Sequence, residues 1–84
     1  MRIRVYALLD EKLGQFNSPI CFPSDGVAQR TMQDEVNRAE AGNAMNRYPE
    51  DFAMYRVAEF DPDSGEMFPE AVPQLVCRAS ALKV

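Results

Sequence analysis

The sequence predicts an α+β domain of two layers, in which one helix packs on a small, mainly antiparallel sheet. Two stretches of alternating apolar and polar residues, each followed by a turn signal, flank a single stretch with helical periodicity. This order predicts β-β-α-β-β, with a last segment that is either a further strand or an extended tail. A chain of 84 residues holds one hydrophobic core, so we expect one domain over residues 1–84.

The first expected element is a β-hairpin over residues 1–22. Residues 2–9 alternate, with Ile3, Val5, Ala7 and Leu9 on one face and Arg2, Arg4, Tyr6 and Leu8 on the other. Gly14 can take the positive φ that a hairpin loop needs. The return strand is expected over residues 15–22, at an edge or bulged, because Pro19 cannot donate to a ladder.

The second expected element is a helix over residues 24–42. Ser24 or Asp25 can cap its first turn, because either side-chain oxygen can accept from a free backbone amide. The helical pattern runs to about Ala41, before Gly42-Asn43, with one apolar stripe: Ala28, Met32, Val36 and Ala39. A single helix covers one face of a sheet, so the other face must be solvated, buried in an oligomer or used for binding.

The third expected element is a second hairpin over residues 52–68. Simple alternation groups Phe52, Met54, Ala58 and Phe60 with Arg56, without showing which face meets the core. Residues 61–65 (Asp-Pro-Asp-Ser-Gly) carry a strong turn signal. Residues 69–84 are expected as an extended tail or an edge strand, because Pro69 and Pro73 confine the start of this segment to an edge.

The composition restricts the function. Nine Lys+Arg against thirteen Asp+Glu give a net charge of −4, and the chain has no His. Catalysis that depends on His is excluded, no constellation supports an enzyme, and we expect neither a cofactor nor a metal. No apolar run approaches the roughly 20 residues of a membrane-spanning helix, so we expect no membrane partner. Cys21 and Cys77 are expected to be free thiols.

The candidate functional residues are cationic and aromatic. At period two, Arg2, Arg4 and Tyr6 point the same way from one strand, and cations interleaved with a ring suit single-stranded nucleic acid. Three more cations complete the candidate nucleic-acid-binding set: Lys12, Arg56 and Arg78. The same strand face could instead be a solvated outer surface or an oligomer interface.

Two stretches of the chain carry a family signal. The first is Asp25-Gly26-Val27-Ala28, then Arg30, Asp34, Val36 and Asn37; the second is Tyr48-Pro49-Glu50-Asp51-Phe52, then Tyr55, Glu59-Phe60-Asp61 and Gly65. With the opening Ile3-Arg4-Val5-Tyr6-Ala7, they resemble the small nonstructural protein of gokushoviruses, single-stranded-DNA phages of the microvirus family. The resemblance covers about residues 1–68. The chain departs from the family pattern at Tyr48, where His is common, and at Val57-Ala58, where Leu-Gly is common.

The resemblance implies a nonstructural phage protein in the bacterial host cytoplasm, associated with single-stranded-DNA production and itself binding DNA. It supplies no catalytic residues. Two functions follow as hypotheses: binding of single-stranded DNA during replication or packaging, or a small oligomeric protein-interaction module that acts as adaptor or inhibitor of a host or phage replication protein. In either case we expect a dimer or a higher oligomer. Salt separates the two, because only DNA binding should weaken steeply with added salt.

Overall fold

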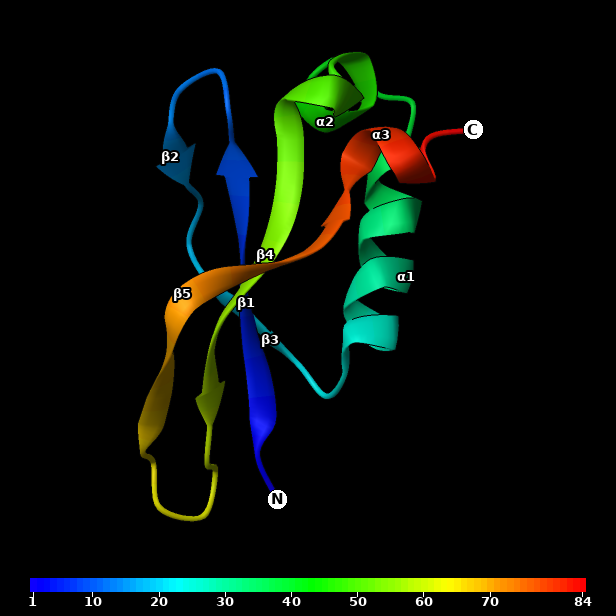
Figure 1. Ribbon diagram of the computed structural model, residues 1–84. Helices are drawn as coiled ribbons and strands as arrows, with labels where there is room; N and C mark the ends of the chain where they lie inside the picture. Colours follow the sequence, from blue (N-terminus) through cyan, green and yellow to red (C-terminus); the bar gives the residue numbers. More distant parts are fainter.

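The computed structural model describes residues 1–84 and confirms the α+β class (Figure 1). The strands are β1 (Ile3–Asp10), β2 (Gln15–Phe16), β3 (Ile20–Phe22), β4 (Phe52–Phe60) and β5 (Met67–Arg78). The helices are α1 (Asp25–Val36), α2 (Ala44–Arg47) and α3 (Ala79–Leu82), with a 3-10 turn at Pro49–Asp51 before β4. No helix is long and apolar enough to cross a membrane.

All strand pairings are antiparallel, and β1 and β4 form the middle of the sheet. β2 and β3 both pair with β1, which pairs with β4, which in turn pairs with β5. The molecule is elongated, 40 by 23 by 20 Å, and α1 lies along one side of the sheet (Figure 1). The hairpin of β4 and β5 extends past the N-terminal end of α1, so part of the sheet has no helix beside it.

The first hairpin has the predicted turn but a divided return strand. Gly14 has φ +69°, the left-handed conformation that the loop requires. The predicted strand over residues 15–22 is two short strands, β2 and β3, on either side of a gap that contains Pro19. Proline has no backbone N–H to donate, which accounts for the break at this edge of the sheet.

Helix α1 begins where the sequence predicts and ends earlier. Ser24 caps it, since its Oγ accepts from the amide of Val27 at 3.3 Å. The helix ends at Val36, not near Ala41, because Asn43 takes over carbonyls at that end. Its Nδ2 donates to the backbone oxygens of Glu35 and Arg38 at 2.8 and 2.9 Å.

The face of β1 that meets the helix is the one that carries Tyr6. Tyr6 is fully buried in a core cluster with Ala28, Met32 and Val36 of α1 and with Met54 of β4. The interpretation of Arg2, Arg4 and Tyr6 as an exposed row is therefore wrong for Tyr6. An aromatic ring has the volume to fill the space under a helix that is thin in bulky residues, and its hydroxyl reaches a polar partner at the rim.

A β-bulge in β4 divides the residues that simple alternation places together. Tyr6 pairs with Arg56 and Val5 pairs with Ala58, so Val57 is an extra residue on β4. An extra residue reverses the alternation of the side chains beyond it. Arg56 therefore shares the helix side with Met54, while Ala58 lies on the opposite face.

The chain after Pro69 is not a loose tail. The turn after β4 forms as predicted, with Gly65 at φ +77°, and β5 then continues along β4 to Arg78. Helix α3 follows and packs near the end of α1, where Nδ2 of Asn37 donates to the Leu82 carbonyl at 2.9 Å. The expected boundary at residue 69 thus falls inside a strand.

The two cysteines are free thiols in different environments, which confirms the expectation of unlinked thiols. Cys21 is exposed on β3, whereas Cys77 is buried with its Sγ 3.4 Å from Sδ of Met32. Burial raises the pKa of the Cys77 thiol and lowers its thiolate fraction.

We therefore expect a thiol reagent added to dilute native protein to label Cys21 rapidly and Cys77 only after denaturation. Intact-protein mass spectrometry counts the labels on each form. Two rapid labels on the native protein, or an unlabelled mass two units below that of the reduced chain, would contradict this assignment.

Candidate nucleic-acid interface

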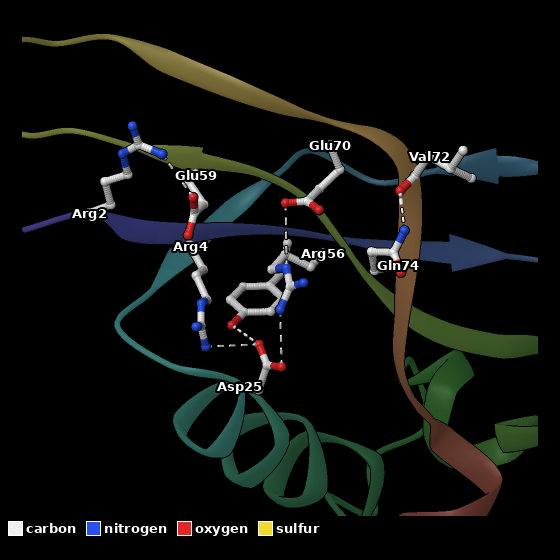
Figure 2. Close-up of polar contacts among 9 residues, drawn as sticks. Arg2, Arg4, Asp25, Arg56, Glu59, Glu70, Val72 and Gln74 are labelled. Carbon is white, nitrogen blue, oxygen red and sulfur yellow. Dashed lines mark hydrogen bonds and ion pairs between the residues drawn. The ribbon is translucent and has the colours of Figure 1, made fainter.

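Three of the predicted cations lie on the helix side of the sheet, along β1 and β4. Arg4 and Arg56 meet at Asp25, at the N-terminal end of α1, whereas Arg2 lies just before β1 and points to Glu59 (Figure 2). The strand register explains this, because Arg4 pairs with Glu59 and the next pair on the same face is Tyr6 with Arg56. We call Arg2, Arg4 and Arg56 the arginine cluster.

Asp25, the first residue of α1, lies between Arg4 and Arg56. Its carboxylate accepts a hydrogen bond of 2.5 Å from the Tyr6 hydroxyl. Nη1 of Arg4 lies 3.6 Å and Nη1 of Arg56 lies 3.4 Å from its two oxygens (Figure 2). A carboxylate is favoured in the first turn by the helix dipole, so Asp25 joins the helix to both central strands.

Two more carboxylates balance the cluster at its margins. Nη1 of Arg2 is 3.2 Å from Oε1 of Glu59, and Nε of Arg56 is 3.7 Å from Oε2 of Glu70. The guanidinium carbon of Arg2 also lies 3.7 Å from the ring centroid of Phe68, a cation–π contact. The ion pairs of Arg2 and Arg4 are solvent-exposed, and such pairs contribute only about 0–1 kcal/mol each.

The buried Tyr6 cannot serve as the stacking ring of this site. Burial, together with the hydrogen bond to Asp25, raises the pKa of Tyr6 to about 12, so the hydroxyl stays protonated at neutral pH. Phe68 is a half-buried aromatic side chain beside the cluster, where its pairing with Glu59 in the second hairpin places it. Counting back from the turn at residues 61–65 gives this pairing, so the sequence did carry the signal for Phe68.

The other two predicted cations lie away from the arginine cluster. Arg78 ends β5, and its Nη1 is 3.1 Å from Oε1 of Glu11 in the β1–β2 loop. Lys12, in the same loop, lines a cleft of about 600 Å³ together with Tyr48 and Phe52. Three carboxylates line this cleft as well: Asp10, Glu50 and Asp51. The six predicted residues therefore do not form one continuous surface.

The fold and the site define a class of protein: a small antiparallel sheet backed by helices, with an arginine cluster at one end. The model of the Phage ORF5 protein family matches residues 3–82, and the chain belongs to this family. Over 71 residues it is 34% identical to Protein ORF5 of Chlamydia phage 1, an alignment that covers 82% of this chain and 74% of that protein. No solved structure matches the chain. The resemblance to a gokushovirus nonstructural protein is thus confirmed.

Proposed function

We propose that this phage nonstructural protein binds single-stranded DNA in the host cytoplasm during replication or packaging. The observation that carries the proposal is the meeting of Arg4 and Arg56 at Asp25, at the N-terminal end of α1, with Arg2 two residues before Arg4 and beside Glu59 (Figure 2). Guanidinium groups bind phosphate through paired N–H donors, and the positive end of a helix dipole adds to their field.

The exposed ion pairs of the cluster allow phosphate to enter. Arg2 and Arg4 have side-chain exposures of 48% and 38%, so phosphate oxygens can replace their carboxylate partners at small cost. The ring of Phe68 and the guanidinium plane over it offer a stacking surface for an unpaired base. Contacts of this kind favour single strands over duplex and carry little information about base sequence.

The charge of the site limits the affinity. The three arginines face Asp25, Glu59 and Glu70, and the whole chain carries −4. Binding should therefore be modest and strongly dependent on salt, because release of counterions supplies most of its free energy.

We expect the substitutions Arg2→Ala and Arg4→Ala together to weaken binding of a labelled thymine oligonucleotide and to flatten its salt dependence. Each lost phosphate contact lowers the slope of log K against log salt by about 0.7 for a single strand. Phe68→Ala should cost roughly 1–3 kcal/mol of binding free energy without changing that slope. Fluorescence anisotropy at several salt concentrations measures both quantities.

The matched control removes two arginines elsewhere. Arg38 pairs with Glu35 and Glu40 beyond α1, and Arg47 lies on α2. Arg38→Ala with Arg47→Ala changes the net charge equally and should leave the slope nearly unchanged. If both double variants lose binding equally, general charge and not the arginine cluster attracts the DNA.

A protein-interaction module is the second candidate, favoured by the sheet face opposite α1, on which Ile3, Val5, Ala7 and Leu9 of β1 lie. In this role the chain would act as adaptor or inhibitor of a host or phage replication protein. Absence of DNA binding by the unmutated protein, at low salt and high micromolar concentration, would reject the first function in favour of this one. Binding to such a partner should persist as salt is raised, since burial of apolar surface drives it.

A further inference from the structure

The sheet has an open face opposite the helices, which we define by Ile3, Val5, Ala7 and Leu9 of β1 and by the residues that pair across the sheet from them. The strand register places Phe16 and Ala53 beside Leu9, and Tyr55 beside Ala7. Beside Val5 and Ile3 it places Cys21, Ala58 and Phe60, and β5 adds Met67, Pro69 and Leu75. All of these side chains are apolar or weakly polar.

The open face has small, buried residues at its centre and large, exposed apolar residues at its margins. Val5, Ala7, Ala53 and Ala58 are at most 6% exposed, yet none belongs to the core cluster around α1. Their neighbours on the same face shield them. At its margins Phe16, Leu75 and Met67 are 45%, 51% and 53% exposed. A contiguous apolar surface of this kind is typical of an interaction site.

The charges on the open face indicate a protein partner and not a nucleic acid. Arg78, which pairs across from Ala53, is the one charged residue in the rows described above, and Glu11 neutralises it at 3.1 Å. Phosphate would find no free cation there. A second copy of this chain would meet no carboxylate in those rows either, although each chain carries −4 overall.

We propose that a second copy of this chain covers the open face, with the two sheets packed face to face around a two-fold axis. The open face is four strands wide, with the strands about 4.8 Å apart, and eight residues long, with a rise of about 3.3 Å per residue. Its flat area is therefore roughly 500 Å². Projecting side chains raise the accessible area towards the roughly 800 Å² per partner that standard interfaces bury. An isologous dimer satisfies both copies at once, because the same surface is used twice.

The strand edges of the sheet are poor alternatives for self-association. β2 and β3 are short and separated by a gap that contains Pro19. At the other edge β5 contains Pro69 and Pro73, and its register to β4 shifts between Arg56 and Ala58. Proline and bulges block the addition of a further strand, so the face and not an edge is the surface that remains.

The test is the mass of the full chain in solution at increasing concentration, measured by light scattering after size-exclusion chromatography. The unmutated protein should approach about 19 kDa, twice 9.5 kDa, at high micromolar concentration. Leu75→Glu should stay at 9.5 kDa, because each copy would bury an unpaired carboxylate against the apolar face of the other. Leu75 is half-exposed in the single chain, so this change should leave the fold intact, which far-UV circular dichroism checks.

Val27→Glu is the matched control, since Val27 is an exposed apolar residue (43%) on α1, away from the open face. It should form the dimer as the unmutated protein does. Labelling of Cys21 should slow as the concentration rises in the unmutated protein and in this control, but not in Leu75→Glu.

Two outcomes would overturn the proposal. The first is an unmutated protein that stays at 9.5 kDa, and the second is a Leu75→Glu variant that associates normally. In the first case, loss of oligonucleotide binding in Leu75→Glu would assign the open face to DNA. Loss of DNA binding in the Arg2 and Arg4 variant leaves the dimer untouched, so the two proposals fail separately.

Discussion

Replacing Tyr6 with alanine should lower the free energy of unfolding by about 3–5 kcal/mol, as removal of a large buried aromatic side chain does. Tyr6 is 0% exposed and packs against α1, β4 and Phe22, whose ring centroid lies 5.8 Å from its own. The substitution leaves a cavity under the helix. It also removes the hydrogen bond that links β1 to Asp25 at the start of α1.

Two further variants separate these contributions. Tyr6→Phe keeps the ring and loses only the bond to Asp25, so we expect a smaller cost of about 1–3 kcal/mol. Tyr48→Ala removes the same side chain from a position that is 48% exposed, and it should cost less than about 1 kcal/mol. Urea unfolding followed by circular dichroism gives all three values. Equal losses for Tyr6→Ala and Tyr48→Ala would show that Tyr6 is not a core residue.

The Tyr6 variants also clarify the DNA-binding proposal. Tyr6→Ala could abolish oligonucleotide binding simply because the protein unfolds. Tyr6→Phe should bind as the unmutated protein does, since the hydroxyl faces Asp25 and not solvent. If a Tyr6→Phe variant folds normally but no longer binds DNA, the Tyr6 hydroxyl belongs to the DNA-binding site.

Local signals in the sequence predicted the order of the elements and several details. The caps and turns depend on one or a few residues, so the sequence narrows the helix cap to Ser24 or Asp25, of which Ser24 is the cap, and predicts the turns at Gly14 and Gly65. Pro19 correctly indicated an irregular return strand. The end of α1 was not predictable in the same way, because it depends on Asn43, which bonds back to carbonyls five and eight residues earlier.

The periodicity of the sequence did not show which face of β1 packs against α1. Ile3, Val5, Ala7 and Leu9 form the more apolar face of β1, but α1 covers the face with Tyr6. Periodicity measures polarity, whereas the helix needs large side chains beneath it and a polar group at its N-terminus. The bulge at Val57 likewise has no local signature, since it appears only in the pairing of β4 with β1.

Only the part of the candidate site that depends on alternation along one strand was predictable from the sequence. Alternation placed Arg2 and Arg4 on one side of β1, and the structure agrees. That Asp25 would lie between Arg4 and Arg56 depends on how α1 crosses the sheet, which no local pattern specifies. Arg78 and Lys12 share only their charge with the arginines of the cluster, and the fold places them elsewhere.

The unmutated protein should lose stability relative to Tyr6→Phe as the pH rises from 10 to 12. In the unfolded chain the tyrosine hydroxyl titrates near 10, whereas burial and the hydrogen bond to Asp25 raise the pKa of Tyr6 to about 12 in the folded protein. The folded state therefore favours the protonated hydroxyl. This contribution is fully present below pH 10 and is lost as the pH rises through 12.

The size of the effect follows from the two pKa values. A difference of about two units corresponds to about 3 kcal/mol, since one unit is about 1.4 kcal/mol. Other groups titrate in the same range, but they are common to both proteins and cancel when the unfolding free energy of Tyr6→Phe is subtracted. Urea unfolding of both proteins at a series of alkaline pH values measures the difference. A constant difference from neutral pH to pH 12 would mean that the Tyr6 hydroxyl is not held protonated by Asp25 and the core.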